Sequence, residues 1–297
     1  MSYRRRSCDV PCQPFRSRDA HRFGLTPRVL RGPRVRRVFT DVYVSADAPD
    51  TLELRARALA LVSAPDTAFT GRTSALLRGL PVRDDGRLHV IVPAGRTVPD
   101  RRDGVCPHEG LRQEDVVDLH GLRVHDAATT WVALAAELRR EDLVVLGDAV
   151  LSEGWATPEQ LAVAVTAAAG RRGVVLARAC LPLLRDRVDS PQETRTRLTL
   201  VDGGLPCPVV NPDVLDDWGE WIGRPDLAYL DLKVAIQYEG DVHRTNRRRW
   251  MQDVGRDAVL EDHGWVVIRV TADDLRRPDL LVARVAGRMA QQRRRPS

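Results

Sequence analysis

Oxygen-bearing side chains gather in the segment RPDLAYLDLKVAIQYEGDVHR, in the last third of the chain. Asp226 opens the first of two runs of strand-forming residues, and Gln237 and Glu239 stand two positions apart near the end of the second. Because side chains along a strand alternate between its two faces, Gln237 and Glu239 share one face. The pattern therefore predicts a polar group at one end of a pair of neighbouring strands.

Carboxylate and amide oxygens on neighbouring strands can hold Mg²⁺ or Mn²⁺, because these ions prefer oxygen ligands. A bound Mg²⁺ can activate water and stabilise charge on a scissile phosphate, which is the chemistry of phosphodiester hydrolysis. We expect Asp226 and Glu239 to be the metal ligands. A polar, solvent-facing hairpin explains the same residues equally well, so the residues alone leave both interpretations open.

A second acidic residue, Asp231, follows the first strand-like run and creates a literal PD…DxK spacing with Asp226. The spacing places Asp231 in the turn between the two strands, where its side chain cannot join Asp226 at a common metal. We therefore prefer Gln237 and Glu239 as the second half of the motif.

Glu193 lies upstream in DSPQETRTRLTLVDGG. Ser190 is expected to cap a helix there, with Pro191 at its first position and Glu193 at its third, as in a capping box. On this segment alone, capping explains Glu193 without a catalytic role.

His243 and a set of arginines follow the second strand, in HRTNRRRWMQDVGR. At that place His243 can contact a phosphate or transfer a proton, although a histidine after a turn is more often a surface residue. Arginines mixed with Trp250 are typical of nucleic-acid-binding surfaces, and a solvated helix start with a core tryptophan explains them too. The residues expected to bind nucleic acid are Arg244, Arg247, Arg248, Arg249 and Arg256.

The elements that position these residues follow from local patterns. Thr70, Asp126 and Thr157 are expected to cap helices, and Gly121 to break a strand. We expect strands at 38–44, 89–93, 116–124 and 265–270, and helices at 50–62, 70–80, 127–138, 141–149, 157–170, 190–203 and 273–289. The middle of the chain is therefore predicted to be α+β, with no catalytic group of its own.

Composition sets the class of partner. The net charge of +5 favours a polyanion, and every basic residue except Lys233 is arginine, which genome composition also explains. No apolar run approaches the ~18 residues that span a bilayer, and the basic N-terminus lacks the apolar core of a secretory signal. We expect a cytoplasmic protein with no membrane partner.

The five scattered cysteines are expected to be reduced thiols without a zinc site: Cys8, Cys12, Cys106, Cys180 and Cys207.

The expected organisation has three parts. Residues 1–22 are arginine-rich and predicted to form a disordered arm. Residues 23–170 form an α+β region, and a basic stretch at 170–190 is the expected junction. Residues 185–290 form a second domain that carries the acidic group.

Three motifs of the C-terminal part occur in the order found in a known family: SPQETRTRLTLVDGGLP, PDLAYLDLKVAIQYEGDVHR and RDAVLEDHGWVVIRVT. They resemble bacterial domains related to very-short-patch-repair (Vsr-like) endonucleases. The resemblance implies a restriction-endonuclease-like PD-(D/E)xK core, a mixed sheet flanked by helices. It implies that Asp226, Glu239 and Glu193 are the site's acids and His243 its histidine. The family usually has a carboxylate at the position of Gln237.

The stretches LRGPRVRRVFTDVYVSADAPDTLELRARA, FTGRTSALLRGL and LHGLRVHDAATTWVALA resemble AbiEi-type antitoxin domains. Such proteins begin with a DNA-binding winged helix, and the resemblance leads us to expect only a truncated form of it in this chain. This likeness bears on architecture more than on activity.

Two functions are compatible with these features. One is a Mg²⁺- or Mn²⁺-dependent DNA endonuclease acting in repair or phage defence. The other is a DNA-binding regulator or antitoxin-like protein whose nuclease fold is catalytically degenerate, which the amide of Gln237 favours. A homodimer and a toxin or defence-locus partner are compatible with either function.

Overall fold

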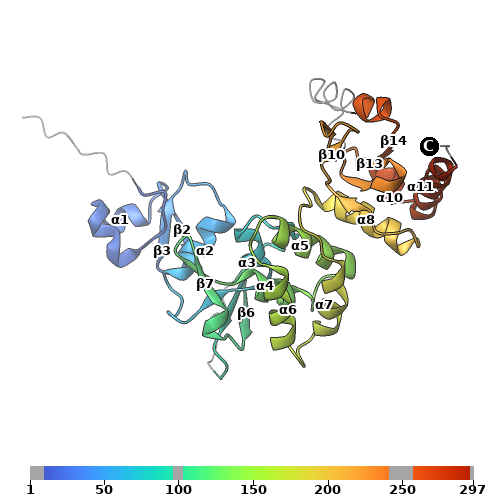
Figure 1. Ribbon diagram of the computed structural model, residues 1–297. Helices are drawn as coiled ribbons and strands as arrows, with labels where there is room; N and C mark the ends of the chain where they lie inside the picture. The colour runs from blue at the N-terminus through green and yellow to red at the C-terminus, as the bar shows by residue number, and fades with distance from the viewer. Residues whose placement is uncertain (1–9, 96–102, 241–256, 295–297) are drawn as a thin grey trace, which may run out of the picture. The chain divides into compact units, whose positions relative to one another are not determined.

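The computed structural model describes residues 10–95, 103–240 and 257–294, and the chain divides into two compact units, residues 1–134 and 135–297 (Figure 1).

The first unit begins with a three-stranded antiparallel sheet in the order β1-β3-β2. The expected single strand at 38–44 is wrong, because a turn at Asp41, whose φ is 69°, divides it into a hairpin. Asp41 also accepts hydrogen bonds from Arg16 and from the hydroxyl of Ser17. Residues 15–22 are therefore structured, in contrast to the expected disordered arm. The elements are β1 (Phe15–Arg16), the 3-10 helix η1 (Ser17–Phe23), α1 (Pro27–Leu30), β2 (Val35–Phe39) and β3 (Val42–Ser45).

A five-stranded mixed sheet in the order β6-β5-β4-β8-β7 forms the centre of the first unit. The β5–β6 and β4–β8 pairs are parallel, and the other two are antiparallel. Asp126 caps α4 as expected, since its Oδ1 accepts a hydrogen bond from the backbone of Thr129. The elements are α2 (Leu52–Ala60), β4 (Ala68–Phe69), α3 (Gly71–Leu77), β5 (Leu88–Val92), β6 (Val105–Glu109), η2 (Gln113–Asp115), β7 (Val116–Leu119), β8 (Leu122–His125) and α4 (Ala127–Leu134).

A helical segment opens the second unit, so the division of the chain falls after Leu134 and not at the expected junction at 170–190. The physical reason is a buried ion pair between Arg197 on α8 and Asp148 on α5, 2.6 Å apart. Asp148 also accepts hydrogen bonds from Thr194 and from the backbone of Arg185. These contacts join α5 to the C-terminal part. The elements are α5 (Arg140–Ser152), α6 (Pro158–Ala167), α7 (Val174–Cys180), η3 (Leu181–Leu183) and α8 (Pro191–Asp202).

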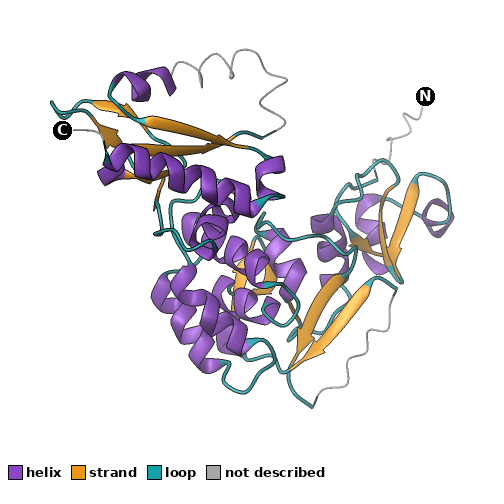
Figure 2. Cartoon of the chain, turned by 90° about the vertical axis from the view of Figure 1, so that its right-hand side faces the viewer, coloured by secondary structure: helices purple, strands orange, loops and turns teal. Residues whose placement is uncertain are grey.

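The second unit contains a four-stranded sheet in the order β14-β13-β12-β9, in which only β13 and β14 are parallel. Helices α8 and α11 cover one face, where Leu200, Ile236 and Val285 are buried together, and Figure 2 shows the long C-terminal helix running along the strands. The elements are β9 (Val209–Val210), β12 (Leu227–Tyr229), η4 (Leu230–Leu232), β13 (Val234–Tyr238), β14 (Val266–Val270), α10 (Ala272–Leu275) and α11 (Pro278–Arg293).

The opposite face of this sheet is covered by the two-stranded ribbon of β10 (Val214–Leu215) and β11 (Trp221–Gly223) and by helical residues 257–262. Ala228 and Ala235 are buried there with Leu260. Both faces of β13 are therefore covered by other elements over Val234–Ile236, and its polar side chains lie at its C-terminal end.

The C-terminal helix begins later than expected. Pro278 has no backbone N–H and cannot continue a helix, but it fits the first helical position. The expected helix at 273–289 is therefore two helices, α10 ending at Leu275 and α11 starting at Pro278. The whole protein is an α+β fold with mixed sheets, as the sequence predicts. Among the described residues, no helix combines the length and apolarity needed to cross a membrane.

Candidate active site

Asp226 directly precedes β12 and is held in one orientation. Its Oδ2 accepts a hydrogen bond of 2.7 Å from the backbone N–H of Tyr238, and its own carbonyl oxygen accepts one of 2.9 Å from the N–H of Asn211. Because Leu227 pairs with Ile236, the next position along each strand brings Asp226 beside Gln237.

Gln237 and Glu239 lie on the same face of the sheet as Asp226. Ala228 and Ala235 are buried under the β10–β11 ribbon, and alternation along the strands puts Asp226 with the first and Gln237 and Glu239 with the second. The alternation expected for β13 is confirmed, because Val234, Ile236 and Tyr238 pack into the core on the opposite face. All three polar residues are half-buried, so the group is open to solvent and to a ligand.

Arg269 on β14 is a member of this group that the sequence analysis did not name. Parallel pairing places it opposite Gln237, its Nε lies 3.1 Å from Glu239 Oε1, and its guanidinium donates twice to Asp257, at 2.9 and 2.7 Å. Hydrogen bonding to Asp257, followed by the attraction of Asp257 and Glu239, raises the pKa of Arg269 despite its partial burial. The site therefore contains a permanent positive charge. The sequence did contain one sign of this residue: Arg269 is the single charged residue in the otherwise apolar strand VVIRV.

Glu193 is buried, and both of its carboxylate oxygens are occupied by hydrogen-bond donors. The hydroxyl of Ser190 donates to Oε1, and the backbone of Asp189 and the amide of Asn211 donate to Oε2, at 2.8, 3.0 and 2.7 Å. Ser190 caps α8 as expected, and Pro191 opens it. The carboxylate binds the Asp189 N–H in place of the cap residue's own N–H, so the expected capping box forms only in part.

Asn211 connects Glu193 to Asp226 and was also missed by the sequence analysis. It is buried with a φ of 42°, its side chain donates to Glu193 and to the carbonyl of Arg187, and its N–H donates to the carbonyl of Asp226. Asn-Pro is a turn signal, and asparagine tolerates a positive φ better than most residues, so the turn was detectable. Its partner, 18 residues away, was not.

Several expected site residues fall in 241–256, outside the described residues: His243, Arg244, Arg247, Arg248, Arg249 and Arg256. Asp231 lies in η4, in the turn between β12 and β13 as expected, and is exposed. The turn is at the end of β12 opposite to Asp226, so Asp231 is separate from the group.

The residue types of the group fit a hard divalent cation. Asp226 and Glu239 offer carboxylate oxygens and Gln237 an amide oxygen on one open face, and such donors suit Mg²⁺ or Mn²⁺. Glu239 already has a cationic partner in Arg269, which lowers the negative charge available to an ion.

A different group of metal-binding side chains lies in the first unit. Cys106 stands near His89 and His108, with one ligand atom of each within 4.8 Å of the others. The sequence analysis expected the cysteines to be reduced thiols without a zinc site, and it did not single out Cys106 together with these histidines. The sequence signal was Cys106-Pro107-His108, since residues two apart on a strand share a face.

No family model matches the sequence. Two proteins of Mycobacterium tuberculosis are each 32% identical to it over 263 residues, an alignment that covers 88% of this chain and 94% of the relative. They are the uncharacterized proteins MT2308, of strain CDC 1551 / Oshkosh, and Rv2248, of strain ATCC 25618 / H37Rv. The chain belongs to the Rv2248 family. Because the alignment covers 88% of the chain, the similarity to the Rv2248 family extends into both compact units.

The crystal structure of the RV2827C protein from Mycobacterium tuberculosis is similar over 62% of this chain and 74% of that chain, with a TM-score of 0.43 and 18% sequence identity.

Proposed function

We propose that the protein is a divalent-metal-dependent DNA endonuclease whose active site is the group at the end of β12 and β13. The observation that carries the proposal is the convergence of Asp226, Gln237 and Glu239 on one solvent-open face. Mg²⁺ or Mn²⁺ bound there would supply charge stabilisation and water activation at a scissile phosphate.

The chain's own residues take distinct parts in this function. Asp226 and Glu239 would hold the ion. The Tyr238 N–H donates a hydrogen bond to Asp226 Oδ2 and so fixes the orientation of this carboxylate. In the metal-free protein Arg269 neutralises Glu239. With an ion and DNA bound, its guanidinium would lie beside the scissile phosphate and stabilise negative charge there. Glu193 is a positioning residue, because its oxygens are occupied and its influence reaches Asp226 through Asn211.

Exposed tryptophans on the β10–β11 ribbon provide a surface for the nucleic acid. Trp218 is 83% exposed and Trp221 is 56% exposed, on the ribbon that covers the same sheet face as Asp226. Solvent-exposed aromatic side chains can stack on unpaired bases. Such stacking does not depend on the nucleotide sequence, because every base has a flat aromatic face. The proposed substrate is therefore DNA with unstacked bases, such as a strand end, a mismatch or a branch.

The test is cleavage of plasmid and oligonucleotide DNA in Mg²⁺ and in Mn²⁺. We expect Asp226→Asn and Glu239→Gln to lower the rate at least about 100-fold, because each removes a charged metal ligand. Asp231→Asn is the matched control: it removes an exposed carboxylate from the same hairpin and leaves the site intact. Cleavage by Asp226→Asn at the wild-type rate would refute the proposal.

A second function, a DNA-binding regulator with a catalytically degenerate nuclease fold, is favoured by two observations. Gln237 contributes no negative charge, and Glu239 is held in an ion pair by Arg269. Such a protein binds DNA with a steep dependence on salt concentration but binds neither Mg²⁺ nor Mn²⁺. Calorimetric titration of the full-length protein with Mn²⁺ separates the two, since only the endonuclease gives a signal that Asp226→Asn abolishes.

A further inference from the structure

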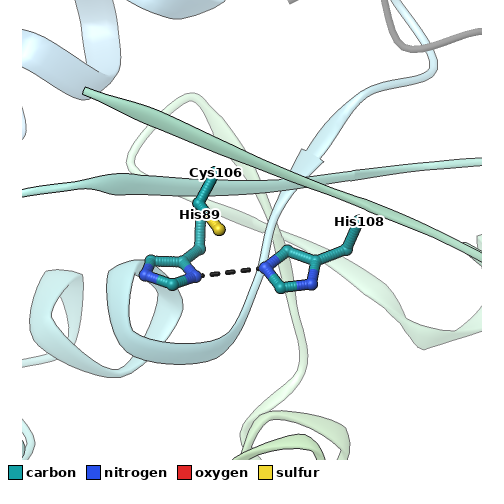
Figure 3. Close-up of side chains that lie close together, drawn as sticks. All are labelled: His89, Cys106 and His108. Carbon is teal, nitrogen blue, oxygen red and sulfur yellow. Dashed lines mark hydrogen bonds between the residues drawn. The ribbon is translucent and has the colours of Figure 1, made fainter. Parts of the chain in front are cut away.

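Two histidines and a cysteine meet on one face of the five-stranded sheet in the first unit. His89 belongs to β5, and Cys106 and His108 occupy alternate positions of β6, so both β6 side chains share a face. Parallel pairing sets His89 opposite Cys106. Figure 3 shows the two imidazole rings with a nitrogen of each directed at the other and the Cys106 sulfur beside their contact.

The nitrogen atoms are placed as two ligands of one ion would be. His89 Nδ1 lies 3.1 Å from His108 Nε2. Two nitrogens bound to a tetrahedral Zn²⁺ at about 2.0–2.1 Å are separated by about 3.3 Å, so the pair already has the spacing of two zinc ligands, and binding takes a rotation of the rings that directs both lone pairs at the ion. The Cys106 Sγ lies within 4.8 Å of a ring nitrogen of each histidine, so a shift on the order of 1 Å brings it to a ligand position.

Asp85 orients the first of these ligands. Its Oδ2 lies 2.9 Å from His89 Nε2, and the His89 side chain is 6% exposed. An Nε2–H that donates to this carboxylate leaves Nδ1 as the lone-pair nitrogen, on the side of the ring that faces His108. A carboxylate behind a histidine is the arrangement that fixes the tautomer of metal-ligating imidazoles.

We propose that His89 Nδ1, His108 Nε2 and Cys106 Sγ bind one Zn²⁺ ion. Imidazole nitrogen and thiolate sulfur form a borderline-soft donor set, which prefers Zn²⁺ to the hard ions that suit the group around Asp226. His89 is buried whereas Cys106 and His108 are half-buried, so the fourth position of the tetrahedron faces solvent and takes a water molecule. The site is independent of the proposed nuclease function, because its residues all belong to the first unit.

Binding releases one proton. Cys106 loses its thiol proton as the sulfur–zinc bond forms. His108 binds through Nε2, so the proton that Nε2 donates toward His89 in the metal-free cluster moves to Nδ1 by exchange with water. The histidines therefore release none, and one proton enters the buffer for each Zn²⁺ bound.

The experiment uses the reduced, chelator-treated full-length protein titrated with Co²⁺ and then Zn²⁺. We expect one equivalent of Co²⁺ to give the visible bands of a tetrahedral site together with a near-ultraviolet thiolate charge-transfer band, and one equivalent of Zn²⁺ to remove both. Cys106→Ser should abolish the thiolate band, and His108→Gln should weaken binding at least about tenfold. Asp85→Asn leaves all three ligands in place and should weaken binding about 10–100-fold.

Matched controls separate the cluster from other thiols and from the second unit. Cys12→Ser removes an exposed cysteine of the same unit and should leave the spectrum unchanged. Asp226→Asn should do the same, whatever its effect on DNA cleavage. A wild-type Co²⁺ complex without a thiolate band, or a band that Cys12→Ser abolishes and Cys106→Ser retains, would overturn the proposal. Circular dichroism of Cys106→Ser and His108→Gln, both at half-buried positions, verifies that the variants are folded.

Discussion

Arg269 on β14 forms an ion pair of 3.1 Å with Glu239 at the end of β13, and the same guanidinium donates two hydrogen bonds to the buried Asp257. One arginine thus neutralises two carboxylates, the half-buried Glu239 of the candidate site and the buried Asp257. Removing the arginine should affect the buried carboxylate more, because water cannot replace the lost hydrogen bonds there.

Replacement of Arg269 by methionine should destabilise the protein. Asp257 is 6% exposed and would keep its carboxylate in a buried position without its main donor, at a cost of about 1–3 kcal/mol. A lower denaturant midpoint measures the effect. Arg276→Met is the control, because the Arg276–Asp273 pair is largely exposed and exposed pairs contribute little. Equal midpoints for the two variants would contradict the role given to Arg269.

Replacement of Gln237 by glutamate should strengthen binding of Mn²⁺ at least about tenfold, because an added carboxylate raises the charge of the ligand set. Gln237→Asn keeps a neutral amide and should not strengthen it. Calorimetric titration with Mn²⁺ measures both variants. If the glutamate variant binds Mn²⁺ no better than wild type, Gln237 does not face the metal position.

Removal of the Asn211 side chain should disturb Asp226 through the backbone. Asn211→Ala leaves Glu193 Oε2 with the Asp189 N–H as its remaining donor and puts alanine at a φ of 42°, so it should lower both the denaturant midpoint and the cleavage rate. Asn211→Gly relieves the backbone strain but not the lost hydrogen bonds. We expect glycine to recover part of the stability and none of the cleavage rate. Full recovery of the rate by glycine would show that strain alone matters.

The pair Asp148–Arg197 should dominate the stability of the second unit. Asp148→Ala leaves a guanidinium that is 1% exposed without its counter-charge, at a cost of about 3–5 kcal/mol. The double variant Asp148→Ala, Arg197→Met removes both charges and should be less destabilised than the sum of the single variants. A double-mutant cycle from urea unfolding measures this coupling. Strict additivity would mean that the pair acts as two independent residues.

Local signals in the sequence predicted the helices and strands that carry the candidate site. Ser190-Pro191 and Thr157-Pro158 mark helix starts by caps within three residues, and both helices begin there. The alternation along Val234–Tyr238 separated the buried face of β13 from the polar one. Pro278 would have divided the last helix correctly, because its missing N–H is equally local.

Contacts between distant segments were beyond the reach of these signals. Only the parallel pairing of β13 and β14 brings Arg269 beside Glu239, and only the return of the chain after β9 brings Asn211 to Glu193. Likewise Asp148 and Arg197 are 49 positions apart in the sequence, so no local pattern reveals the ion pair that joins α5 to the second unit. The sequence by itself determined the residue types, the helix caps and the strand faces, because these depend on neighbours along the chain. The tertiary structure decided which polar groups meet, because that depends on strand register and buried partners, which local periodicity does not encode.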